Sequence, residues 1–150
     1  MNPWLFSFLI SIVLLVLLIN WNHFSVNIYG GLISAFFMIM QNLIVHSTGL
    51  WEYHQASLFA NKVIFSNYLN VFIIGIAFSM GTLFFQFLPK NLYIQLIHAF
   101  MWTLLFILFK YLASQYNLIT YYHFNNLTNT HVLVFFLSLA WFKNTFLKTN

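Results

Sequence analysis

The chain consists of long apolar stretches that almost no charged residue interrupts. Five stretches, separated by short segments containing asparagine, serine, glycine or proline, cover residues 4–19, 28–47, 67–87, 92–116 and 130–146. A helix rises about 1.5 Å per residue, so about 17 to 25 apolar residues cross a hydrocarbon core about 30 Å thick. The first stretch is marginal in length. The sequence therefore predicts an all-α fold, with residues 1–150 forming one integral membrane domain, a polytopic helix bundle of about five transmembrane helices.

The composition supports a membrane environment. Hydrophobic residues make up 62% of the chain and charged residues 4%, and the charged residues are five lysines and one glutamate. A soluble protein has about a quarter of its residues charged. The apolar runs are continuous, whereas the strands of a membrane barrel alternate apolar and polar residues. Helices are predicted because a helix satisfies every backbone polar group within its own segment.

Several functional classes lack a signature in the sequence. The absence of cysteine excludes disulfides and thiolate chemistry, and the lysines are scattered, whereas nucleic-acid-binding surfaces cluster them. No two of the six histidines stand four residues apart, as a helical metal site requires, and no Gly-x-Ser-x-Gly elbow or phosphate-binding glycine loop is present. We therefore expect no metal, no cofactor and no nucleic-acid partner. The expected partner is the lipid bilayer, with other membrane proteins or a homo-oligomer as alternatives.

The lysines predict an orientation. Five crossings put the termini on opposite sides, with Lys90, Lys143 and Lys148 on one side and Lys62 on the other, joined there by Lys110 if a residue inside the fourth stretch is counted. Cytoplasmic loops carry an excess of lysine and arginine. We expect a multi-pass protein of the cell membrane with its amino terminus outside and its carboxy terminus in the cytoplasm.

In this topology, polar residues from three helices and two loops gather at the extracytoplasmic end. Among them is the only acidic residue, in the segment Leu-Trp-Glu-Tyr-His at 50–54. Ionisable groups in or beside membrane helices are costly and indicate a site by default. We predict a polar pocket formed by Glu52, Lys110, His46, His54, His123, Asn42, Asn70 and Asn125. An ion pair between Glu52 and Lys110 is the first hypothesis to test.

Simpler interpretations of the same residues stay open. Lys110 lies about 9 Å below the predicted helix end, so its stem can reach the interface as an anchor. Glu52 can be a hydrated loop residue, and the aromatic residues beside it can belong to the belt that forms at membrane surfaces. The asparagines can form interhelical hydrogen bonds worth about 0.6 kcal/mol each. Gln41 can form an interhelical hydrogen bond of the same kind.

Small residues four apart predict close helix packing. Gly30 with Ser34, and Gly31 with Ala35, form two such pairs in the second stretch. The third stretch repeats the pattern with Gly75 and Ser79, and with Ala77 and Gly81. Such pairs let two helix backbones approach closely. We expect the second and third helices to pack together, or one of them to form a homomeric contact.

The segment 41–142 resembles a known family on the order of its motifs. These are Gly-Leu-Trp-Glu-Tyr at 49–53, Leu-Pro-Lys at 88–90, Tyr93, Trp102, and Ile-Thr-Tyr-Tyr-His at 119–123 followed by two asparagines. The pattern is similar to an uncharacterised family of small integral membrane proteins frequent in spore-forming Gram-positive bacteria. The resemblance implies a five-helix membrane bundle and supplies no reaction. Members often carry an acid where this chain has Asn70 and another where it has Lys110.

Two classes of function follow from these features. In the first, the protein is a non-enzymatic accessory, binding or transport-associated component with a polar pocket at its extracytoplasmic end. In the second, it is an intramembrane enzyme acting on an apolar lipid or isoprenoid-like substrate, with Glu52 as proton donor and His123 as its polar partner. The first is favoured, because acid and base chemistry ordinarily needs a second group of defined charge and the chain has one carboxylate.

Overall fold

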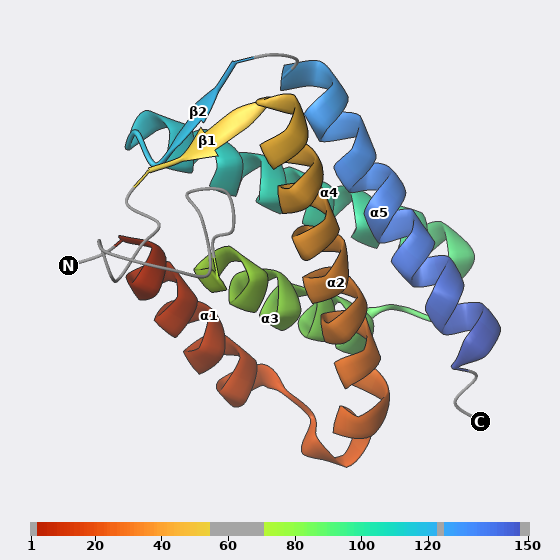
Figure 1. Ribbon diagram of the computed structural model, residues 1–150. Coiled ribbons are helices and arrows are strands. Elements are labelled where there is room, and N and C mark those ends of the chain that lie inside the picture. Colours follow the sequence, from red (N-terminus) through yellow and green to blue (C-terminus); the bar gives the residue numbers. More distant parts are fainter. Residues whose placement is uncertain (1–2, 55–70, 123–124, 148–150) are drawn as a thin grey trace.

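A computed structural model describes residues 3–54, 71–122 and 125–147, excluding the side chains of residues 46 and 125–129. The described elements, in chain order, are α1 (Pro3–Leu18), a short 3₁₀ helix η1 (Trp21–His23), α2 (Phe24–Thr48), β1 (Trp51–Tyr53), α3 (Val71–Phe87), α4 (Leu92–Gln115), β2 (Ile119–Tyr121) and α5 (Asn125–Phe146) (Figure 1). The predicted all-α class is confirmed, and each apolar stretch coincides with a helix. The two short strands were not predicted.

The helix ends coincide with the polar breaks in the sequence. Asn20 accepts a hydrogen bond from the Asn22 amide at the start of η1, and Asn91 caps α4 by accepting from the Tyr93 amide at 2.9 Å. Ser, Thr, Asp and Asn are favoured at this position because their side chains satisfy a backbone donor that the first turn leaves unpaired. At the other end of α2, Gly49 has a φ of 62° and donates its amide to Val45 O. A left-handed residue of this kind suits glycine.

The five helices run alternately away from the two-stranded sheet and back toward it (Figure 1). At one end, here called the sheet end, Trp4 Nε1 at the start of α1 donates a hydrogen bond to His54 O just after β1. At the opposite end, the far end, Gln86 of α3 donates to Leu18 O of α1. The starts of α1, α3 and α5 and the ends of α2 and α4 therefore lie at the sheet end, and the start of α1 and the end of α5 lie at opposite ends of the bundle.

Helix α3 lies at the centre and packs most extensively on α2. A Cβ atom on Gly81 would collide with Gly30 O and Ser34 Oγ, and one on Gly31 would collide with Thr82 and Phe78. These small residues thus form a contact within one chain, in which the α2 and α3 backbones approach each other closely.

The other small pair of the third stretch serves a different contact. A Cβ on Gly75 would collide with the Phe8 ring of α1, and Ser79 Oγ lies 3.5 Å from Ser11 Oγ of α1. Helix α3 therefore has two close-packing faces, one toward α2 and one toward α1.

By length and composition, two of the described helical segments are able to cross a membrane, namely Trp21–Val45 and Leu92–Gln115. Helices α1 and α3 are apolar but shorter, at 16 and 17 residues, or about 24 and 26 Å. Helix α5 starts with two polar turns. Only 33% and 17% of the most apolar windows of the two long segments are buried. The core helix of a soluble protein would be mostly covered.

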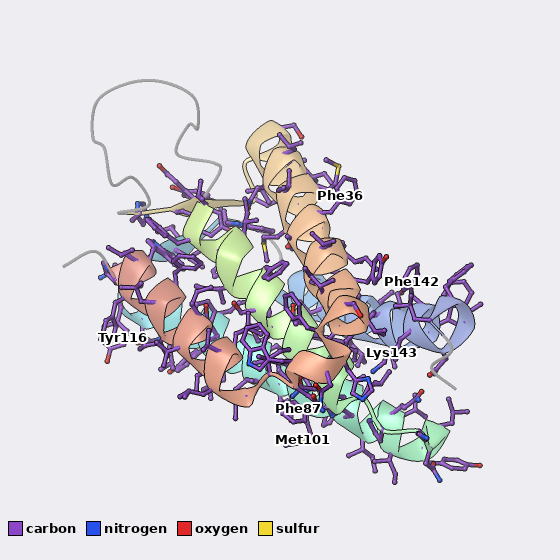
Figure 2. All side chains as sticks on the ribbon, turned by 90° about the horizontal axis from the view of Figure 1, so that it is seen from below. Phe36, Phe87, Met101, Tyr116, Phe142 and Lys143 are labelled. Atoms are coloured by element: carbon purple, nitrogen blue, oxygen red, sulfur yellow. The ribbon has the colours of Figure 1, made fainter. Side chains whose placement is uncertain are left out.

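Large apolar side chains cover the outside of the bundle. In Figure 2, Phe36 and Met101 project from the outer sides of α2 and α4, and they are 62% and 58% exposed. Half of the residues of α1 are exposed as well, and Trp4 and Leu15 are its buried residues. Soluble monomers rarely expose contiguous apolar patches of more than a few hundred Å². The outer surface thus has the character expected against lipid.

Candidate functional site

The sheet separates the predicted site residues into two groups. Strands β1 and β2 are antiparallel, and Trp51 is paired with Tyr121, Glu52 with Thr120, and Tyr53 with Ile119. Side chains directly opposite each other in such a pair share a face, and successive residues alternate between faces. The inner face, toward the helices, carries Trp51, Tyr53, Ile119 and Tyr121, and the first three of these are buried. The outer face carries Glu52 and Thr120.

Polar pairs occupy the outer face. The Tyr122 hydroxyl donates a hydrogen bond to Glu52 Oε2 at 3.0 Å in an exposed position. His54 Nε2 lies 2.8 Å from Thr120 Oγ1. Glu52 and His54, two members of the predicted pocket, therefore lie on the side of the sheet away from the bundle.

The inner face forms an aromatic lid on the helices. Trp4 of α1 is fully buried, and its ring meets Tyr53 edge-on with centroids 5.8 Å apart. The Tyr53 hydroxyl donates to Asn42 Oδ1 of α2 at 3.0 Å. Burial raises the pKa of Tyr53 to about 12, so its hydroxyl stays protonated and available as a donor. Among the described residues, the Asn42 amide nitrogen is buried without a hydrogen-bond partner.

A cavity of about 30 Å³ lies beneath this lid. Its lining consists of Met38, Gln41, Trp51, Tyr53, Ile73, Ile76, Ala77, Phe106, Phe109, Lys110, Ile119, Tyr121 and His131. The volume corresponds to about one water molecule. Three polar side chains from three different helices, α2, α4 and α5, thus converge on a space that is otherwise lined mainly by apolar and aromatic groups.

The three polar side chains make defined contacts. Gln41 Nε2 and His131 Nε2 are 2.6 Å apart. The Lys110 ammonium lies 5.1 Å from the centroid of the Tyr121 ring, a distance at which a cation is attracted to the π face. We call Gln41, Lys110 and His131 the inner polar cluster.

The geometry gives no support to the hypothesis of an ion pair between Glu52 and Lys110, which stays a prediction. Glu52 bonds to Tyr122 on the outer face, whereas Lys110 stacks on Tyr121 on the inner face. The alternation of side chains along a strand places the sheet between the two charges. The sequence suggested a loop at 50–54, where this alternation could not be foreseen.

The other predicted members of the pocket are placed only in part. Asn42 lies under the lid, as described above. His46 is within α2 and Asn125 begins α5, but their side chains are not described. Asn70 and His123 lie outside the described residues. The structure brings Asn42 and Lys110 to the inner side of the sheet and Glu52 and His54 to the outer side.

His131 is the residue that the sequence prediction missed. It lies within the predicted apolar stretch 130–146, and an ionisable side chain in such a stretch is costly enough to mark a site. That rule would have identified it. The roles of Trp4 and Tyr53 in the lid carried no comparable signal, because they depend on two strands of three residues each.

Metal binding finds no support in the described ranges, where no three His, Asp or Glu side chains are grouped to hold an ion. Comparisons of the chain with protein-family models, curated proteins and solved structures find no match. The resemblance to a family of small membrane proteins therefore stays a prediction. The site has to be interpreted from its own chemistry.

Proposed function

We propose that the protein is a multi-pass integral membrane protein whose five helices all cross the bilayer. The alternating direction of the helices supports this proposal, because each helix runs between the two ends of the bundle in the direction opposite to the helix before it (Figure 1). The exposed apolar surface supports it as well. Helices α1 and α3 are a few ångströms short of a typical core, and bilayers thin locally around short spans at a modest cost.

The charges support an orientation. Lys90 precedes α4 and Lys143 lies in the last turn of α5, both at the far end. Glu52 and Lys110 lie at the sheet end. The positive-inside rule then makes the far end cytoplasmic and the sheet end extracytoplasmic. Lys62 and Lys148 lie outside the described residues.

The function favoured by the geometry is non-enzymatic binding at the extracytoplasmic end, as an accessory or transport-associated component. One observation carries it: the inner polar cluster converges on a cavity under an aromatic lid. Binding sites combine mainly apolar walls with a few placed polar groups, and this cavity, at about 30 Å³, has room for a group of the size of one water molecule. The enzymatic alternative loses support because its proton donor, Glu52, is on the other face of the sheet and does not line the cavity.

A pair of substitutions tests this function in a deletion strain with a measurable phenotype. Lys110→Met removes the charge of the inner polar cluster, and Glu52→Gln removes the charge of the outer face with nearly unchanged shape. We expect Lys110→Met to abolish complementation and Glu52→Gln to retain it, at equal abundance in the membrane fraction. Loss of function in Glu52→Gln alone would reject the binding site under the lid and restore the enzymatic alternative.

A further inference from the structure

A second open space lies on the side of the bundle, between α2 and α5. Figure 1 shows these helices close together at the sheet end and diverging toward the far end. The groove between them has a volume of about 500 Å³. It is lined by Ile33, Phe36, Phe37, Met40, His131, Val134, Phe135, Ser138, Leu139, Trp141 and Phe142. Binding sites for small molecules commonly enclose about 300 to 1,000 Å³.

The groove is apolar along its length and polar at one end. Phe37 and Phe135 stack across it, with ring centroids 4.2 Å apart and planes 17° from parallel. The Ser138 hydroxyl donates to Val134 O in its own helix and adds little polarity. His131 lies at the start of the lining, near the sheet, and is paired there with Gln41. A molecule that matches this surface has a long apolar part and one polar end.

A helix of a partner protein or of a second copy fits the groove poorly. Helices in membranes approach each other on small residues. On α2, Gly30, Gly31 and Ser34 are already in contact with α3. The groove instead presents large side chains, such as Phe36 at 62% and Trp141 at 61% exposure. A flexible hydrocarbon chain can follow such an irregular wall, whereas a rigid helix cannot.

We propose that the groove between α2 and α5 binds the hydrocarbon chain of a membrane amphiphile, with the polar head at the sheet end against the Gln41 and His131 pair. This inference rests on the proposed membrane embedding. The polar head then lies in the extracytoplasmic leaflet, nearly two turns into α5 from the sheet. His131 lines both the groove and the cavity under the lid. The amphiphile's head is thus held beside the inner polar cluster.

The test is photolabelling of the full chain in vesicles of phosphatidylcholine. A small share of the lipid carries a diazirine near the end of one acyl chain, and labelled peptides are mapped by mass spectrometry. We expect several-fold more label on the groove residues of α2 and α5 than on Leu104 and Leu108, which are exposed on α4.

Two matched variants make the result specific. Ser138→Trp fills the groove and is expected to remove the excess label there, while Leu104→Trp, on the outer side of α4, leaves it unchanged. His131→Leu is expected to reduce the groove label by weakening the contact with the head, with the α4 label as the control for folding and insertion.

The outcomes that overturn the inference are distinct from failure of the proposed function. Equal label on α4 and on the groove means that lipid only surrounds the protein, and it rejects the groove site alone. Disulfide crosslinking between the Ser138→Cys side chains of two chains in the same vesicles would show that a second copy occupies the groove, and it would reject the lipid. A chain that takes up no label at any helix is not in the bilayer, which rejects the proposed membrane embedding itself.

Discussion

The two ends of the bundle use polar side chains in opposite ways. At the far end, polar groups tie helix ends together. At the sheet end, they converge on an enclosed space. In a chain with so few charged residues, this difference separates the groups that hold the fold from those that can recognise a ligand.

The far end is joined through backbone groups that helix ends leave unpaired. Gln86 donates to Leu18 O and accepts from the Asn20 amide, both at 2.6 Å, so one side chain satisfies both sides of the link after α1. The Lys143 ammonium donates to Phe85 O. The last carbonyls and first amides of a helix have no intrahelical partner, and such contacts compensate for them.

Side-chain amides complete the far end. Gln95 of α4 and Asn144 of α5 bond in both directions, at 2.7 and 3.3 Å, and Gln95 also donates to Pro89 O. These contacts join neighbouring helices and face no described cavity. Gln95 and Asn144 therefore join α4 to α5 at the far end.

The sheet end differs because its polar groups line a cavity. The inner polar cluster is enclosed by aromatic rings, and the outer pairs around Glu52 and His54 are separated from it by the sheet. Substitutions at the far end should change stability, and substitutions in the inner polar cluster should change binding.

The largest loss of stability is expected at the contact between α2 and α3, because the packing of these two helices supports both ends of the bundle. Gly81→Leu forces bulk between α2 and α3 against the backbone of Gly30. Overpacking of this kind costs about 1 to 3 kcal/mol and more when backbone has to move. We expect loss of the folded protein in mild detergent, measured by thermal unfolding. Leu104→Phe on the exposed side of α4 is the control, and an equally small effect of both would show that the α2 and α3 contact is not tight.

The next effect concerns the lid. Tyr53→Phe removes the donor to Asn42 Oδ1 and leaves a buried carbonyl oxygen unsatisfied, at a cost of about 1 to 3 kcal/mol. Tyr122→Phe removes the exposed bond to Glu52 and should cost less than about 0.5 kcal/mol. Unfolding of the two variants side by side measures the difference. Equal costs would contradict the distinction between the inner and outer faces.

A smaller effect is expected at the far end. Gln86→Leu removes two hydrogen bonds that are partly open to solvent, at a cost of about 1 kcal/mol. We expect lower stability but unchanged complementation once the abundance in the membrane is matched. A Gln86→Leu variant of normal abundance that fails to complement would show that the far end has a role in function beyond joining the helices.

The sequence allowed the helices to be predicted but not the sheet. The apolar stretches and the Asn20, Gly49 and Asn91 breaks follow from local chemistry, so α4 and the end of α2 were predicted to within one residue, whereas α2 starts four residues before the predicted stretch. The strands are three residues long and pair across 66 to 70 positions of sequence. No local pattern fixes such a pairing. Its register decides that Glu52 and Lys110 face opposite ways.

The membrane position of the two ends is most directly tested by labelling single cysteines in intact cells with a membrane-impermeant maleimide. The chain contains no cysteine, so each introduced thiol is unique. Tyr116→Cys marks the sheet end and Asn22→Cys the far end, and both positions are exposed. We expect the first to react in intact cells and the second only after permeabilisation. Reaction of both in intact cells, or of neither, would contradict the arrangement in which the two ends lie on opposite sides of the bilayer.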